Sequence, residues 1–540
     1  METGEDQQKD LSFASSSNSD IDALLDSAIF ELQIELKTPL GAVLATTRHR
    51  VAPQRSHETH QVEFDLDALL SFGHRDDGDD VQLILSLRLA TPDAPTWLVI
   101  DEQRLHSFAF VRATDHNDAA GVVRVDYRRP GSRGGTVLVG GDHTPFFPFA
   151  FFYNWGGYLR ETERGLELLD EVASAGFNVI HPVSPFDPPT TPAGHSLHDW
   201  FDRCHQLGLR FHYDLRHSYK NLTQVQLEVE AYRGHPALLS WYIADEPDGP
   251  GDDPALAVAA YRLVKRLDPR HPVSLVLNCR DSSPSFLDAT DIMMTDVYPI
   301  GIDTTRCNAT FGVCGCDGCE GRPSDVAHRL DHYRRSWPPA LRHRMPIWIV
   351  LQAFGGEHHW SRLPTPQEIR LMTYLALMHD ANGIFYWLYP IGDGDDATAL
   401  EAEIGRLCRE VLQTLAPFII AAGSQSGVEI SASSAGVHIR AWTNGSGDGA
   451  ILLLVANTRE ETVTASIEVP WPGLWGTRMR RLFVADGDGD AADQLGLSTI
   501  RLTLAALETR AYLLVPPQPI DPLALLLAKL ELHQHQQHQR

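Results

Sequence analysis

The 540-residue chain lacks any apolar stretch approaching the roughly 20 residues needed to cross a bilayer. Its opening, METGEDQQKD, has neither the basic region nor the apolar region of a signal peptide. Basic residues are also few, because 45 Lys and Arg stand against 71 Asp and Glu, for a formal charge of −26. So acidic a surface repels phosphate backbones. We therefore expect no membrane span and no nucleic-acid partner.

Cysteine is scarce too, with seven residues in the chain, yet four of them crowd into the segment CNATFGVCGCDGCEG. Such a cluster predicts a pair of short disulfides that fix the shape of a long loop, and a small zinc site is the alternative. We expect four structural cysteines, which are Cys307, Cys314, Cys316 and Cys319.

The cysteine cluster bears on the compartment, because disulfides persist in oxidising surroundings. N-x-S/T sequons at Asn221, Asn308 and Asn444 are compatible with an exported glycoprotein. We therefore expect an extracellular protein whose leader is missing from this sequence. The polar, acidic start leaves a cytoplasmic location as the alternative.

Both flanks of the chain have the pattern of β-sheet domains. Residues 1–20 are mostly polar, and we expect them to be disordered. Residues 21–140 contain short alternating runs such as VQLILSLRLA between turn residues, which predicts an N-terminal β-sandwich. Residues 424–517 repeat this pattern and predict a C-terminal β-sandwich. The His- and Gln-rich end of residues 518–540 is typical of a low-complexity tail.

Residues 141–423 alternate apolar strand-like runs with amphipathic helical segments. Eight such units follow one another, which is the number that closes a parallel sheet into an α/β (β/α)8 barrel, or TIM barrel. No Gly-rich phosphate loop follows the first strand, so an open nucleotide-binding sheet is disfavoured. The predicted strands lie at 148–155, 177–186, 209–217, 238–247, 273–279, 291–301, 346–356 and 382–390.

In such barrels the chemistry gathers where strands end and the loops to the helices begin. The predicted strand ends combine aromatic rings with carboxylates and amides. A sugar site needs this mixture, because rings stack on the apolar face of a pyranose while acids bond its hydroxyls. The candidate substrate-binding residues are Asn154, Trp155, His181, His212, Asp214, Asp296, Tyr298, Gln352 and Trp387.

The fourth predicted strand ends in Asp245-Glu246-Pro247, directly after the apolar run WYIA. A (β/α)8 barrel with an acid-Glu-Pro triplet at this position resembles the clan A glycoside hydrolases, whose Asn-Glu-Pro triplet carries the general acid/base. The resemblance covers the barrel, about half of the chain. It implies that Glu246 is the acid/base and that Asp245 replaces the family's Asn. It also implies that Tyr298 and Trp387 match the aromatic residues after strands 6 and 8.

The sequence departs from this family at strand 7, where clan members carry the nucleophilic Glu. The run PIWIVLQAFGGEHHW has Gln352 there, and a carboxamide is a poor nucleophile. Glu357, in the same loop, is our first candidate for the second carboxylate. Asp296 or Asp214 could supply it from a neighbouring strand.

Two further alternatives stay open at this point. A 2-acetamido group of the substrate could attack, with Asp245 orienting it and Glu246 as the acid, as in hexosaminidases. The other alternative is that no hydrolysis occurs. Consecutive strand residues point to opposite faces, so Asp245 either shares the cleft with Glu246 or faces the outer layer.

We expect an O-glycoside hydrolase that acts on an oligo- or polysaccharide, with catalytic residues Glu246, Glu357 and Asp245. We expect no organic cofactor and no metal. One alternative is a non-catalytic carbohydrate-binding protein on a decayed barrel, which Gln352 favours. Another is a metal-dependent hydrolase that uses His212, Asp214 and His217. The sequence leaves the sugar, the linkage and the oligomeric state open.

Overall fold

The computed structural model describes strands within residues 29–109 and most of residues 122–515. Its gaps in the second range are 127–135, 141–143, 156–158, 160–164, 184–194, 305–315, 343–344, 421–430, 433, 444–449, 469–477, 484–493 and 496–498. The chain divides into two compact units, residues 1–112 and 113–540. The predicted disordered segment 1–20 and the predicted tail 518–540 lie outside the described residues.

The first unit contains one four-stranded antiparallel sheet in the order β2-β1-β3-β4. Strand β1 pairs with both β2 and β3, and the alternating run of 81–90 forms most of β3. The described residues of this unit form a single sheet, and the two-sheet sandwich over 21–140 stays a prediction. The strands are β1 Ile29–Lys37, β2 Val43–Val51, β3 Asp80–Ala90 and β4 Leu98–Ala109.

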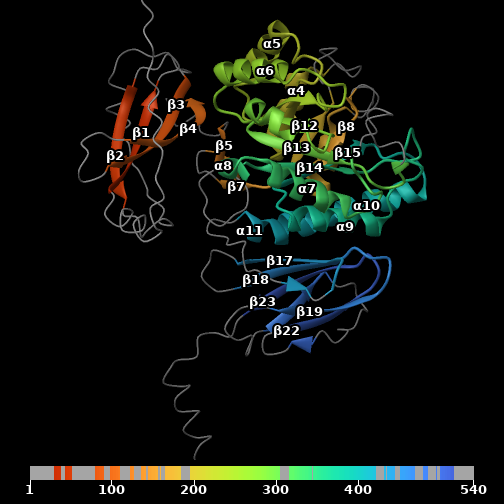
Figure 1. Ribbon diagram of the computed structural model, residues 1–540. Helices are drawn as coiled ribbons and strands as arrows, with labels where there is room; N and C mark the ends of the chain where they lie inside the picture. Colours follow the sequence, from red (N-terminus) through yellow and green to blue (C-terminus); the bar gives the residue numbers. More distant parts are fainter. Residues whose placement is uncertain are drawn as a thin grey trace, which may run out of the picture. The chain divides into compact units, whose positions relative to one another are not determined.

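The second unit is built around a closed barrel of eight parallel strands, as predicted (Figure 1). All eight predicted strands are present, and the last, β15, pairs with the first, β8. The barrel strands are β8 Phe149–Tyr153, β9 Val179–Pro182, β10 Arg210–Asp214, β11 Leu238–Asp245, β12 Val273–Leu277, β13 Ile292–Val297, β14 Ile347–Gln352 and β15 Gly383–Tyr389.

The alternation of side chains along β8 shows how the barrel is packed. Phe149, Phe151 and Tyr153 point outward into the large cluster shared with the helices. Ala150 and Phe152 point inward into the cluster that fills the barrel. Because both faces of each strand are buried, the strands read in the sequence as continuous apolar runs.

Helices follow the strands and cover the barrel. The predicted helix after β12 is a short 3-10 helix, η4, which begins with Ser283-Pro284. No helix in the described part of the chain is both long and apolar enough to span a membrane. The helices are α3 Glu167–Ala175, α4 Leu197–Leu207, α5 Leu222–Tyr232, α6 Pro254–Leu267, η4 Ser283–Ala289, α7 Asp325–Ser336, α8 Pro339–Arg342, α9 Pro366–Met378, α10 Asp395–Glu410, the π-helix η6 Val411–Leu415 and α11 Ala416–Ile419.

A small antiparallel sheet packs with the interior of the barrel. It consists of β5 Val123–Asp126, β6 Thr136–Val139 and β7 Thr144–Phe146. Val123, Val137 and Val139 share the inner cluster with Ala150, near the start of β8. The sequence pattern placed these strands in the N-terminal sandwich, whereas in the structure they belong to the barrel unit.

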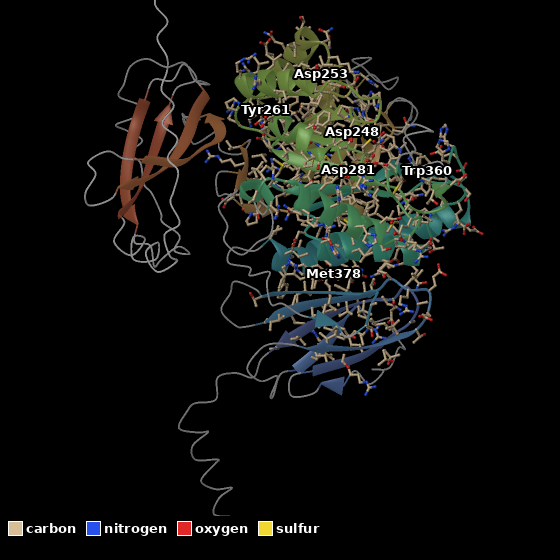
Figure 2. All side chains as sticks on the ribbon, in the orientation of Figure 1. Asp248, Asp253, Tyr261, Asp281, Trp360 and Met378 are labelled. Carbon is tan, nitrogen blue, oxygen red and sulfur yellow. A yellow bond between two sulfur atoms is a disulfide. The ribbon has the colours of Figure 1, made fainter. Side chains whose placement is uncertain are left out.

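Two four-stranded sheets follow the barrel, in the orders β16-β19-β22-β21 and β17-β18-β23-β20. Buried side chains from both sheets share one apolar cluster, and others, such as Trp442 and Leu452, belong to the large cluster of the barrel and its helices. Met378, at the end of α9, lies beside them (Figure 2), and His379 Nε2 is 2.9 Å from His438 Nδ1 on β17. The strands are β16 Ser431–Ala432, β17 Val437–Thr443, β18 Ile451–Asn457, β19 Val463–Glu468, β20 Arg478–Leu482, β21 Gln494–Leu495, β22 Thr499–Leu504 and β23 Thr509–Val515.

Candidate active site

Asp245 and Glu246 lie at the carboxyl end of β11, at the mouth of the barrel. The register between β11 and β12 shifts between Tyr242 and Asp245, and Glu246 follows with a φ of 44°. This left-handed conformation is costly for a residue that carries a side chain. The N–H of Glu246 donates to the carbonyl of Val276 (3.1 Å). After this turn, the two consecutive acids approach different neighbours.

Glu246 faces the ends of β12 and β13. Asn278 Nδ2 donates a hydrogen bond to Oε2 of Glu246 (2.8 Å), and the carboxyl group of Asp296 lies close to that of Glu246. Asp296 is only 2% exposed. Its burial, and then the charge of Glu246 beside it, raise the pKa of Asp296 well above its ordinary value. The raised pKa favours the protonated form of Asp296, and we call Glu246 and Asp296 the carboxyl pair.

The loop after β14 packs against Tyr298, whose ring meets that of Phe354 with centroids 5.0 Å apart. Trp360, labelled in Figure 2, donates from Nε1 to the carbonyl of Tyr298 (2.7 Å). Glu357 lies at the start of this turn, where its carbonyl accepts from the N–H of Trp360 (2.9 Å). Its side chain is exposed, and within the described residues it has no hydrogen bond to Glu246. Glu357 thus lies on the loop surface.

Asp245 approaches the loop that follows β10. Arg216 Nη1 donates to Oδ2 of Asp245 (2.6 Å), and the hydroxyl of Tyr242 donates to Oδ1. Burial raises the pKa of Asp245, and Arg216 offsets part of the rise. The Arg216 guanidinium also lies over the rings of Trp387 (5.3 Å) and Phe152 (5.8 Å). Asp245 therefore reaches the mouth as part of an ion pair surrounded by aromatic rings.

A chain of buried polar groups runs from Arg216 into the barrel. Arg216 Nε donates to Asp214 (2.7 Å), and Asp214 bonds to His181 Nε2 (3.1 Å). His181 Nδ1 meets His212 Nδ1 (2.9 Å), and His212 Nε2 meets the hydroxyl of Ser274 (2.8 Å). Burial lowers the pKa of His181 to about 4 and lowers that of His212 well below its usual range. Both imidazoles are therefore neutral near pH 7.

This row of hydrogen-bonded side chains bears on the alternative of a metal-dependent hydrolase. Both ring nitrogens of His212 already have hydrogen-bond partners, and Asp214 is held by Arg216. His217 is exposed. In the part of the chain that the structure describes, no group of three His, Cys, Asp or Glu side chains is placed to hold a metal ion.

Gln352 ends β14 and is completely buried. Its Oε1 accepts from the N–H of Ile300 (2.8 Å). Its Nε2 donates to the carbonyls of Ile300 (2.9 Å) and Phe354 (3.1 Å). All of these partners are backbone groups, so the carboxamide ties the segment after β13 to the segment after β14.

Gln352→Glu, which introduces the family's residue, is expected to destabilise the protein. A carboxylate cannot donate to the two carbonyls, and an unpaired buried charge is costly. Because burial would raise the pKa of the introduced carboxyl group, the loss should be small at about pH 5 and grow by about pH 8. Thermal unfolding at both pH values measures it. Gln352→Met, which loses the same bonds without adding charge, is the control. An equal loss in both variants at both pH values would contradict this account.

The predicted aromatic residues separate into two environments. Trp387 is partly exposed and packs inward against Phe152, with ring centroids 5.3 Å apart. Trp155 is buried and meets Trp200 of α4 edge-on at 5.2 Å. The N–H of Asn154 donates to the carbonyl of Tyr389 (3.0 Å). Trp387 thus adjoins Arg216 at the mouth, whereas Trp155 packs among the helices.

The described part of the cysteine cluster lies between β13 and α7. Cys316 and Cys319 form a disulfide, and Cys307 and Cys314 lie outside the described residues. Of the three sequons, Asn221 is exposed and caps α5 by accepting from the N–H of Gln224 (3.3 Å). Asn308 and Asn444 are also outside the described residues.

Asn278 completes the site without having been among the predicted residues, and Arg216 lies in the predicted strand 209–217. Asn278 is the first residue after β12, so reading that strand end would have found it. Arg216 lies two residues beyond Asp214 in the run DLRH. Its role depends on the ion pair with Asp245, which sequence spacing does not reveal.

No family model matches this sequence, and no curated protein matches it. A family 5 glycoside hydrolase from Bacteroides vulgatus ATCC 8482 aligns with a TM-score of 0.51 at 12% identity, over 73% of this chain and 94% of the other. The two proteins share a fold. A putative alpha-galactosidase from Bacteroides fragilis NCTC 9343 has a TM-score of 0.45 at 11% identity, over 91% of this chain and 95% of the other. A family 39 glycoside hydrolase from Bacteroides cellulosilyticus WH2 has a TM-score of 0.42 at 12% identity, over 90% and 95%.

Proposed function

We propose that this protein is an O-glycoside hydrolase and that the carboxyl pair of Glu246 and Asp296 carries the reaction. The observation that supports this most is the close approach of the two carboxyl groups at the carboxyl ends of β11 and β13. Glycoside hydrolysis by acid/base catalysis requires one carboxyl group that gives a proton and another that stays negative. Burial and the neighbouring carboxyl group favour a protonated Asp296, so the pair holds a proton beside the mouth of the barrel.

The two members of the pair differ in exposure, which suggests their roles. Glu246 is partly exposed and is the member that can meet a substrate, so it delivers the proton to the glycosidic oxygen. Asp296 is buried behind it. Once the proton has left, both carboxylates are negative beside the positive charge that develops on the sugar ring. The positive charge on the ring then offsets the repulsion between the two carboxylates.

The remaining mouth residues would bind the sugar. Trp387 offers a ring face that can stack on a pyranose. Asp245, with a side chain 30% exposed and fixed by Arg216, offers an acceptor for hydroxyl groups. Asp245 could equally orient a 2-acetamido group, so hexosaminidase-like hydrolysis remains a version of the same proposal. Glu357 is the other candidate for the second carboxylate.

The proposal is tested by incubating the full-length protein with a panel of oligosaccharides, polysaccharides and aryl glycosides and measuring the sugar released. We expect release from at least one substrate class, with and without a chelator. Loss of all activity in the chelator would favour the metal-dependent alternative.

A non-catalytic carbohydrate-binding protein is the second candidate, and Gln352 favours it. The end of β14 supplies no carboxylate, and its carboxamide is fully occupied by backbone groups. Saturable glycan binding by the wild-type protein without release from any substrate in the panel would support this candidate and contradict the hydrolase.

A further inference from the structure

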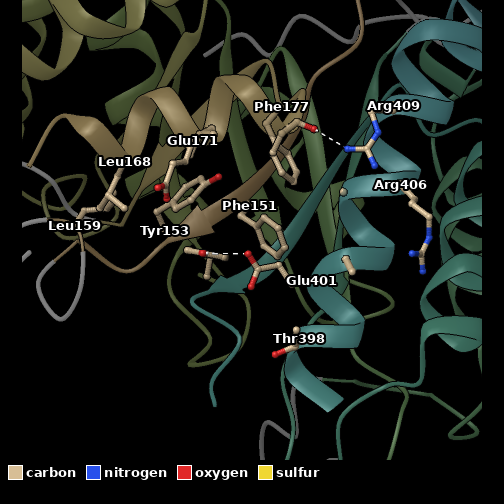
Figure 3. A pocket seen from close by; sticks show the side chains of 15 residues that line it. Phe151, Tyr153, Leu159, Leu168, Glu171, Phe177, Thr398, Glu401, Arg406 and Arg409 are labelled. Carbon is tan, nitrogen blue, oxygen red and sulfur yellow. Dashed lines mark hydrogen bonds between the residues drawn. The ribbon is translucent and has the colours of Figure 1, made fainter. Parts of the chain in front are cut away.

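A cavity of about 530 Å³ lies on the side of the barrel, between α3 and α10 (Figure 3). Its lining combines two carboxylates, Glu171 and Glu401, with two arginines, Arg406 and Arg409, so its charges select no class of ligand. It shares no residue with the carboxyl pair. The buried charge that bears on the carboxyl pair lies on another helix, α7.

Arg329 of α7 is buried at the carboxyl ends of β12 and β13, with 3% of its surface exposed. Its Nη1 donates to the carbonyl of Asn278 (2.7 Å) and, more weakly, to the carbonyl of Asp296 (3.4 Å). Its Nη2 donates to the carbonyl of Asp317 (2.7 Å), which lies between the two disulfide-bonded cysteines. Among the described residues, Arg329 forms no ion pair.

A guanidinium group buried without a carboxylate is costly, because no counter-ion offsets the loss of its hydration. What the side chain offers in return is a rigid fork of donors, which can fix several carbonyl groups at set positions. Arg329 places this fork where two barrel strands end, since Asn278 follows β12 and Asp296 belongs to β13. The contacts therefore indicate that Arg329 positions these strand ends.

The backbone on both sides of this contact is held as well. Tyr333, also on α7, donates from its hydroxyl to the carbonyl of Cys279 (3.0 Å). Asp248 accepts from the N–H of Asn278 (3.3 Å) and from that of Cys279 (3.0 Å). From this fixed backbone, the Asn278 side chain donates to Oε2 of Glu246 (2.8 Å).

We propose that Arg329 is a positioning residue for Glu246 and that it acts through Asn278. The guanidinium group fixes the Asn278 backbone, and the Asn278 amide then fixes the carboxyl group that delivers the proton. The catalytic effect of this contact presupposes the proposed hydrolase function. Displacing a reacting group by about 1 Å can cost about 10²-fold in rate, so loosening the contact should slow the reaction.

Arg334, on the same helix, provides a matched control. It is 7% exposed, and it donates to backbone carbonyls that include those of Met345 (2.9 Å) and Asp380 (3.1 Å). These two residues precede β14 and β15, so they lie at the amino ends of the strands, away from the mouth. Replacing Arg334 therefore removes bonds of the same kind without loosening the contact to Glu246.

The activity of Arg329→Met is compared with that of Arg334→Met on an oligosaccharide and on a dinitrophenyl glycoside. We expect Arg329→Met to lower kcat/KM on the oligosaccharide by about 10²-fold, mostly through kcat. Its loss should be much smaller on the dinitrophenyl glycoside, whose leaving group needs no acid. Arg334→Met should cleave both substrates at close to the wild-type rate, although both variants should unfold at a lower temperature. Equal losses in the two variants, or an equal loss of Arg329→Met on the two substrates, would overturn the proposal.

Arg329→Lys keeps the charge but not the fork, and it carries the comparison if Arg329→Met does not fold. One ammonium group can donate to the carbonyl of Asn278 but cannot span that carbonyl and the carbonyl of Asp317 together. We expect kcat/KM on the oligosaccharide to fall about tenfold. A folded Arg329→Lys protein with wild-type rates on both substrates would contradict the positioning role.

Crystal structures of the same variants measure the positioning without any assay of activity. In Arg329→Met, and in Arg329→Lys, the distance from Asn278 Nδ2 to Glu246 Oε2 should exceed about 3.5 Å, beyond hydrogen-bond length. Arg334→Met should keep the bond. An unchanged distance in the folded Arg329 variants would overturn the proposal even if their activity falls. If the wild-type protein cleaves no glycoside, the hydrolase function fails, and this distance still decides whether Arg329 positions Glu246.

Discussion

Replacing Glu246 with Gln is expected to lower kcat/KM for glycoside cleavage by about 10²-fold or more. The carboxamide has the shape of the carboxyl group and can still accept from Asn278 Nδ2, but it carries no proton that it can give to a leaving group. The φ of 44° at this position is unchanged, so the variant should fold. Initial rates on an oligosaccharide, compared with the wild type, measure the effect.

The size of this loss should depend on the leaving group. A dinitrophenolate departs without being protonated, whereas a sugar alkoxide needs the acid. The loss in Glu246→Gln should therefore be much smaller for a dinitrophenyl glycoside than for an oligosaccharide. Equal losses on both substrates would show that Glu246 acts in some way other than as the acid.

Glu357→Gln is the matched variant for the choice of the second carboxylate. Glu357 is exposed and has no hydrogen bond to the carboxyl pair within the described residues, so this variant should keep most of the activity. If it loses as much as Glu246→Gln while Asp296→Asn remains active, Glu357 is the partner and the loop must bring it to the mouth when substrate binds.

The barrel could be predicted from the sequence because each strand is buried on both faces. Such strands are continuous apolar runs, and eight of them alternate with helical segments. The 3-10 helix η4 was harder to recognise, since Pro284 and only seven residues leave little helical pattern. The strands β5 to β7 look like any half-buried sheet, and only the packing of Val123 and Val137 with the barrel interior assigns them to that unit.

The candidate site was predictable as a collection of strand ends but not as a set of contacts. The period of two left open whether Asp245 and Glu246 share the cleft. The structure brings both side chains to the mouth because the left-handed φ of Glu246 interrupts the alternation. A glutamate in the sequence does not indicate this conformation. The contacts of Gln352 were not predictable either. A glutamine at this position excludes a nucleophilic carboxylate, but the sequence does not show that its side chain bonds to three backbone groups.

Asp296→Asn tests the carboxyl pair through stability as well as activity. Burial, then the charge of Glu246, raise the pKa of Asp296 well above its ordinary value of 3.8. An acid of this kind stabilises the folded state fully below its unfolded pKa, and this contribution is lost as the pH rises toward its folded pKa. At neutral pH the unfolded chain releases the proton that the folded chain retains, and asparagine removes that cost.

We therefore expect Asp296→Asn to unfold at a higher temperature than the wild type near pH 7, with the difference vanishing near pH 3. Each kcal/mol corresponds to about 2–4 °C in a domain of this size or somewhat smaller. Activity should meanwhile fall by about 10²-fold, because the second negative charge is lost. A gain in stability with unchanged activity would mean that Asp296 is only a buried neighbour of Glu246. Glu357 would then be the candidate for the second carboxylate. A loss of stability near pH 7 would contradict a protonated Asp296, since the amide can donate a hydrogen bond as the protonated acid does.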